Sequence, residues 1–156
     1  SIKAVQVVQQ QLALVGVRVK ITVLEAGERV ARIHNVKRPE DSALELYYTG
    51  WAASSDADWS LRPLYYGPSM PPVLFNTAYY RNPEVDRLLD EALSINDEVE
   101  SRKVYAGIQE RIRSDAPYVW LILEDTAAAW REELSGFTAT PDGGIDFIKA
   151  EWHPEK

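Results

Sequence analysis

Two carboxylates stand between two tryptophans in the stretch YYTGWAASSDADW at residues 47–59. Asp56 and Asp58 are two positions apart, and Trp51 and Trp59 lie on either side of them. Glycoside hydrolases use two carboxylates against a bound sugar, and tryptophan rings stack on sugars. A catalytic pair must stand on both sides of the scissile bond, however, whereas two acids so close in a loop more often cap a turn or a helix start. Ligand contact and a structural turn are therefore favoured over catalysis, and a carbohydrate-active domain that uses Asp56 and Asp58 with stacking tryptophans is the alternative.

Other catalytic and metal chemistry finds little support in the sequence. The chain has no cysteine, and its two histidines, His34 and His153, lie far apart and outside any HxxxH or HExxH pattern. No GxSxG motif is present. The glycine pair Gly143-Gly144 precedes the strand-like IDFI and not a helix, so we expect a turn there and no phosphate site. The sequence thus predicts no metal, no cofactor and no enzyme.

Composition indicates one soluble globular domain and leaves small-molecule partners open. The 156 residues are 46% hydrophobic and 26% charged, and no apolar run approaches the roughly 20 residues that cross a bilayer. The net charge is −7, with acidic and basic residues intermixed. This argues against nucleic acid and against an anionic membrane surface, because both attract clustered basic residues.

Helical and strand-like patterns alternate along the chain, which predicts an α/β fold with a mixed sheet flanked by helices. Helices are expected at 3–15, before Gly16, and at 25–33. Further helices should follow the caps Asn82 and Asp97, and the second of them should stop at 115–117. Strands are expected at 17–23, 43–50 and 118–123. Prolines predict an irregular stretch at 60–81, and little core is expected after about residue 131.

Four segments resemble one protein family in sequence and in order: VQQQLALVGVRVKI, YYTGWAASSDADWSLRPL, FNTAYYRNPEVDRLLDEAL and YAGIQERIRSDAPYVWLIL. They resemble the C-terminal lobe of the family 5 extracytoplasmic solute-binding proteins, which serve peptide- and nickel-type ABC importers. The GW followed by a small-polar loop and ADW, and the LFNTAYY after a proline pair, are most similar to the glutathione-binding branch.

The resemblance implies one lobe of a two-lobed periplasmic-binding-protein type II fold. Residues 1–130 would form the ligand-binding lobe, and residues 131–156 a tail that returns to the N-terminal lobe, which this chain lacks. The implied protein is a periplasmic monomer that binds no nucleic acid. It would capture a peptide-like solute such as glutathione or a dipeptide for an ABC importer's membrane permease. We expect the single lobe to bind weakly or not at all, because one lobe alone leaves most of a small ligand's surface exposed to water.

The resemblance also implies where the ligand would bind. Trp51 matches the family's GW tryptophan at the interlobe cleft. Dipeptide-binding members place an aspartate shortly afterwards to pair with the ligand's α-amino group. Ser54 is the nearest residue here, so Asp56 or Asp58 would have to supply the charge. Asn76 and Thr77 would orient the ligand, with FNTAYY (75–80) as an opposing wall. The expected ligand-binding residues are Trp51, Ser54, Asp56, Asp58, Trp59, Asn76, Thr77 and Tyr79.

Overall fold

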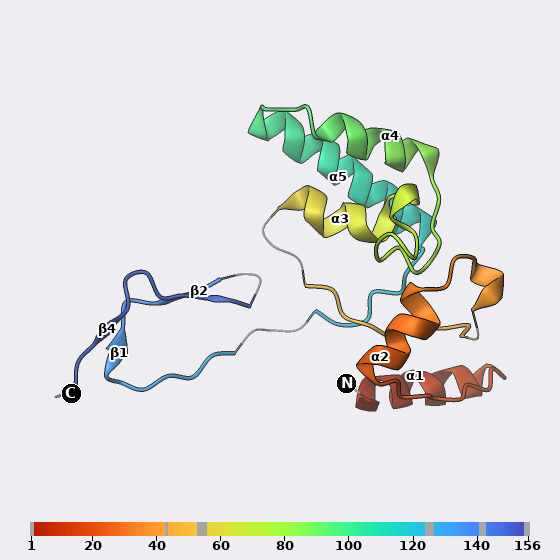
Figure 1. Ribbon diagram of the computed structural model, residues 1–156, viewed down its shortest axis with the longest axis horizontal. Coiled ribbons are helices and arrows are strands. Elements are labelled where there is room, and N and C mark those ends of the chain that lie inside the picture. The colour runs from red at the N-terminus through yellow and green to blue at the C-terminus, as the bar shows by residue number, and fades with distance from the viewer. Residues whose placement is uncertain (1, 43, 53–55, 124–126, 141–142, 155–156) are drawn as a thin grey trace. The chain divides into compact units, whose positions relative to one another are not determined.

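The computed structural model describes residues 2–42, 44–52, 56–123, 127–140 and 143–154. The chain separates into two compact units, Ser1–Gly50 and Trp51–Lys156. Figure 1 shows the helices and strands coloured along the chain. The expected boundary near residue 131 does not coincide with this division and stays a prediction.

The first unit contains helices with little core. Helix α1 (Ile2–Leu14) ends as expected: Gly16 has φ +83°, and the Val17 amide donates to the Leu12 carbonyl at 2.9 Å. This is the left-handed glycine cap that the sequence predicts. After an extended segment come α2 (Ala26–Arg29), the π-helical turn η1 (Val30–His34) and the 3-10 turn η2 (Pro39–Asp41). Ile33 is the one buried side chain among the described residues of this unit.

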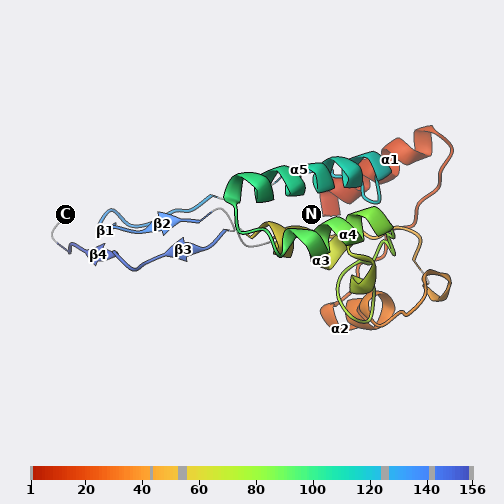
Figure 2. The ribbon, with the colours of Figure 1, turned by 90° about the horizontal axis from the view of Figure 1, so that it is seen from above.

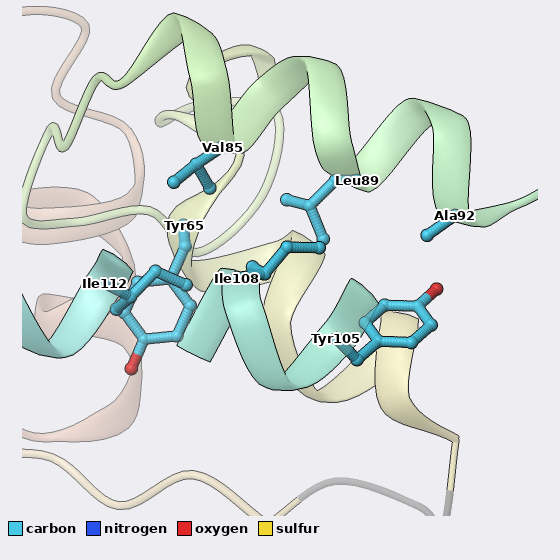
Figure 3. Packing of buried hydrophobic residues seen from close by; sticks show 7 residues of the cluster. All are labelled: Tyr65, Val85, Leu89, Ala92, Tyr105, Ile108 and Ile112. Atoms are coloured by element: carbon cyan, nitrogen blue, oxygen red, sulfur yellow. The ribbon is translucent and has the colours of Figure 1, made fainter. Parts of the chain in front are cut away.

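The second unit contains a three-helix cluster made of α3 (Ala57–Tyr65), α4 (Pro83–Ala92) and α5 (Glu98–Asp115). Helices α4 and α5 run antiparallel beside each other, and α3 packs against both (Figures 1 and 2). Their facing side chains form the hydrophobic core, in which Leu89 of α4 points toward Ile108 of α5 (Figure 3). The core consists of Tyr65, Val85, Leu89, Ala92, Tyr105, Ile108 and Ile112.

The starts of α4 and α5 and the end of α5 are those expected from the sequence. The Asn82 side chain accepts hydrogen bonds from the Glu84 and Val85 amides, and Asp97 accepts one from the Glu100 amide at 2.8 Å. Each satisfies amides that lack a partner in the first helical turn. Helix α5 stops at Ala116, whose φ of +48° takes the chain out of the helix.

The predicted strands at 17–23, 43–50 and 118–123 are wrong. Where the structure describes these segments, the chain is extended without strand pairing. A strand is stable only when a neighbour accepts its backbone hydrogen bonds and covers its apolar face. No described strand pairs with these segments, and much of their apolar surface is open to solvent: Val23 is 71% exposed and Leu123 is 96% exposed. The mixed sheet flanked by helices is therefore not present in the described ranges.

The strands that do form are short and lie after residue 130. Strand β1 (Leu134–Ser135) pairs antiparallel with β4 (Glu151–Trp152), and β2 (Thr138–Ala139) pairs antiparallel with β3 (Ile145–Asp146). No described residue from 131 to 154 is buried, which confirms that this region adds little core. Helices combined with small sheets keep the chain in the broad α/β class.

The 60–81 region was expected to be irregular, but its first part is helical. Helix α3 extends to Tyr65 with Pro63 inside it, and the short turn η3 (Gly67–Ser69) follows. Proline lacks the amide that a helix interior needs. Here Pro63 lies in the last turn, is fully buried, and its carbonyl accepts the Phe75 amide at 3.2 Å. Burial and this loop contact offset the lost hydrogen bond.

Asp115 joins the end of α5 to the loop before α4. Its Oδ2 accepts hydrogen bonds from the Tyr80 hydroxyl and from Asn82 Nδ2, both at 2.6 Å. These two bonds stabilise the carboxylate and hold the pKa of Asp115 below its ordinary value. The contact therefore stabilises the folded chain only while Asp115 is ionised.

Acid should accordingly weaken this contact. Because the folded pKa is depressed, the contribution is complete above the unfolded pKa near 4 and is lost as the pH falls through the lower folded value. We expect the melting temperature, measured by circular dichroism, to fall as the pH is lowered from about 5 to about 2.5. The fall should be larger in the wild-type chain than in Asp115→Asn. An equal fall in both would show that Asp115 does not carry the effect.

Candidate functional site

Asp56 forms the start of α3. Its Oδ1 accepts a hydrogen bond from the Trp59 amide at 2.7 Å, and its carbonyl accepts one from the Ser60 hydroxyl at 2.8 Å. This is a helix N-cap, one of the structural roles that closely spaced acids suggest. The residue is exposed to solvent.

Asp58 belongs to an ion-pair network between α3 and α4. It accepts the Arg62 Nε hydrogen bond at 2.8 Å, and Arg62 also binds Asp90 at 2.9 Å and the Leu89 carbonyl at 2.7 Å. Burial alone would lower the pKa of Arg62, but the bonds to Asp58 and Asp90 outweigh it and raise that pKa. The Asp58 side chain is only 18% exposed, so its charge is largely committed to Arg62.

These roles remove the geometric basis for a carbohydrate-active site. Two catalytic carboxylates must face each other across a substrate. Asp56 instead caps α3 and Asp58 pairs with Arg62 on the same helix.

Trp51 lies on the surface of its unit and contacts Phe75. The two ring centroids are 5.5 Å apart with an interplanar angle of 52°. The indole is 37% exposed and the Phe75 ring 39% exposed, and Trp59 is exposed as well. A surface aromatic pair of this kind provides an angled apolar face that a solute could contact. FNTAYY was expected to form an opposing wall, but its Phe75 extends the wall that contains Trp51.

Asn76 lies beneath the surface and not where a solute could contact it. The residue is fully buried. Its Nδ2 donates to the carbonyls of Tyr66 and Tyr80, and its Oδ1 accepts the Tyr80 amide, at 2.9 to 3.0 Å. All of the amide group's hydrogens are thus used within the loop. The expected ligand contact of Asn76 does not fit this position, because its polar atoms face the backbone.

The other expected residues lie around this buried asparagine or outside the described ranges. The Thr77 amide donates to the Phe75 carbonyl at 2.7 Å, which tightens the turn. Tyr79 has φ +51°, a left-handed conformation that is rare for a bulky residue. Ser54 lies outside the residues that the structure describes. The structure therefore brings Trp51 to the loop that contains Thr77 and Tyr79, through Phe75.

Phe75 is the residue that the sequence reasoning missed as an individual contact. Its aromatic neighbours were noted, but the pattern gave no reason to single it out. The one usable signal was its position next to Asn76. When the Asn76 side chain is buried, the side chain of its neighbour Phe75 faces solvent.

The described ranges contain no competing metal site, and the apolar hollow near the C-terminal strands does not include the expected site residues. No group of three or more His, Cys, Asp or Glu side chains is placed to hold a metal ion. An apolar hollow lies at the C-terminal strands but includes none of the expected site residues; it is lined by Ala128, Ala129, Trp130, Arg131, Leu134, Phe137, Ile145, Phe147 and Trp152. No described helix has the length and apolar content to cross a membrane.

The site geometry gives structural roles to both acids and leaves the aromatic rings exposed. Comparison with known proteins adds an independent observation. The chain is 40% identical over 150 residues to the glutathione-binding protein GsiB of Escherichia coli (strain K12). The corresponding proteins of Shigella flexneri serotype 5b (strain 8401) and Shigella dysenteriae serotype 1 (strain Sd197) show the same identity. No protein-family model matches the chain.

The matched region covers 96% of this chain but 29% of each of these relatives. The chain is thus homologous to glutathione-binding proteins over nearly its whole length and spans less than a third of theirs. This confirms the resemblance to the glutathione-binding branch that the sequence motifs indicate.

Proposed function

We propose that this chain is one lobe of a two-lobed extracytoplasmic solute-binding protein with the type II fold. The complete protein captures a peptide-like solute such as glutathione or a dipeptide in the periplasm. It hands the solute to the membrane permease of an ABC importer without chemical turnover. The observation that carries the proposal is the 40% identity to glutathione-binding proteins over 96% of the chain.

The extended apolar segments support this proposal. Residues 17–23 and 118–123 have the side-chain pattern of strands but no strand partner in the described residues. Neighbouring strands from the rest of a longer protein would supply the missing hydrogen bonds and cover the exposed side chains. Residues 131–156 would then be the tail that returns to the other lobe.

Within the lobe, the proposed ligand surface centres on Trp51 and includes Trp59, Thr77 and Tyr79. Asp56 is the better placed of the two acids to receive a ligand ammonium, because it is exposed while Asp58 is paired with Arg62. Such a charge-assisted hydrogen bond would fix the amino end of the solute. Ser54 is included on the resemblance alone.

Replacing Trp51 by alanine in the complete protein should weaken glutathione binding by about 1–3 kcal/mol, or roughly fivefold to 150-fold. The loss follows from removing the indole face that packs on the solute. Isothermal titration calorimetry with reduced glutathione measures it. Val99→Ala, which changes a side chain that is 62% exposed at the start of α5, serves as the control and should leave affinity unchanged.

The same titration also tests the proposal as a whole. The complete wild-type protein should bind reduced glutathione or a dipeptide, and the 156-residue chain alone should bind either solute weakly or not at all. A complete protein that binds neither solute would contradict the proposed function. Micromolar binding by the chain alone would contradict the need for a second lobe.

A further inference from the structure

Phe75 and Trp51 form an aromatic pair from two separate segments. Trp51 precedes α3, and Phe75 follows it in the loop before α4. Their ring centroids are 5.5 Å apart, yet each residue keeps more than a third of its surface exposed. Aromatic pairs usually stabilise a protein by burying their faces. A pair that stays open in this way provides an apolar surface for another group.

The backbone of Phe75 is fixed on both sides. Its amide donates to the Pro63 carbonyl at 3.2 Å, and its carbonyl accepts the Thr77 amide at 2.7 Å. The next residue, Asn76, is fully buried and makes three hydrogen bonds to the backbone of Tyr66 and Tyr80. With Asn76 held inside, the ring of Phe75 is mounted on a rigid turn. A rigid aromatic contact loses little conformational entropy when a ligand binds.

We infer that Phe75 is a second aromatic ligand contact, which acts with Trp51 to receive the apolar part of a peptide-like solute. This inference rests on the proposed function and adds a residue that the expected set lacks. The two tilted rings together cover more of a small side chain than one ring could. Aromatic faces accept aliphatic CH groups and sulfur, so the cysteinyl side chain of glutathione is a suitable occupant.

The test is a set of glutathione titrations on the complete protein. Phe75→Ala should weaken binding of reduced glutathione by roughly tenfold, whereas Phe75→Tyr, which keeps the ring, should stay within about twofold of wild type. Because the two rings act together, Trp51→Ala combined with Phe75→Ala should cost less than the product of the separate losses. Val73→Ala, in the same loop and 69% exposed, is the control for loop perturbation.

Each outcome bears on the inference. Wild-type affinity in Phe75→Ala overturns it while the proposed function stands. Losses that multiply independently in the double variant overturn the paired action, and an equal loss in Val73→Ala shows a general loop effect and also overturns it. If Phe75→Ala unfolds, Phe75→Leu keeps apolar volume without the ring and should still bind several-fold more weakly. A wild-type protein that binds no peptide-like solute overturns the proposed function and this inference with it.

Discussion

Replacing Leu89 by alanine should lower the free energy of unfolding of the three-helix cluster by about 2–5 kcal/mol. Leu89 is fully buried in α4 and points toward Ile108 of α5 (Figure 3). Truncation removes buried methyl groups and leaves a cavity between the two helices, which the fixed backbones cannot close. Urea denaturation of the chain, followed by circular dichroism at the helical band, measures the change.

Leu93→Ala is the matched control for this experiment. The same side chain is truncated only four residues later, at the end of α4, but Leu93 is 63% exposed. Surface truncations usually change stability by less than about 0.5 kcal/mol. Equal losses in the two variants would mean that Leu89 does not occupy the core position described above.

Helix boundaries were predictable because their determinants are local. Asn82 and Asp97 satisfy amides only two or three residues away, and Gly16 takes a conformation that its own lack of a side chain permits. Such features can be found in a short window of sequence. The missed helix α3 shows the limit, because Pro63 reads locally as a helix breaker. Its burial and its contact with Phe75 are tertiary.

Strands depend on segments that the local pattern does not contain. The alternation at 17–23 and the apolar run at 118–123 describe side chains suited to a sheet, but a sheet also needs neighbouring strands. No other described segment pairs with these two as a strand, so they form no sheet and many of their apolar side chains stay exposed. The sequence pattern correctly indicated side chains suited to a sheet but wrongly predicted that these segments pair as strands.

The candidate site likewise has features that the sequence predicted and others that only the structure reveals. The sequence identified Trp51 and the adjacent acids as unusual, and the structure places Trp51 on the surface. It did not show that Asp58 is paired with Arg62, because helix α3, which brings the two side chains together, was not predicted. Nor did it show that Asn76 is buried, because Tyr66 lies ten residues away along the chain. From the sequence alone, a polar loop residue that binds a ligand cannot be distinguished from one whose hydrogen bonds are made within the protein.

Asn76 should therefore be more important for stability than for direct binding. Asn76→Leu keeps the approximate size of the side chain but removes three hydrogen bonds. The Tyr66 carbonyl keeps its bond from the Ser69 amide, whereas the Tyr80 amide and carbonyl lose their partner. Leaving these two groups unpaired should cost about 2–5 kcal/mol of the free energy of unfolding. Urea denaturation at pH 7 measures this loss against the wild-type chain.

Asn76→Asp tests the same hydrogen bonds through their pH dependence. At neutral pH the new carboxylate would be buried against the carbonyls of Tyr66 and Tyr80, so its folded pKa must rise above the unfolded value near 4. The variant should lose stability relative to wild type as the pH rises from about 4 to 7, because ionisation is then favoured only in the unfolded chain. Asn76→Leu has no group to ionise and should show a deficit that is independent of pH. Denaturation at both ends of this range separates the two cases. A deficit for Asn76→Asp that does not change with pH would mean that this side chain is not enclosed by backbone carbonyls.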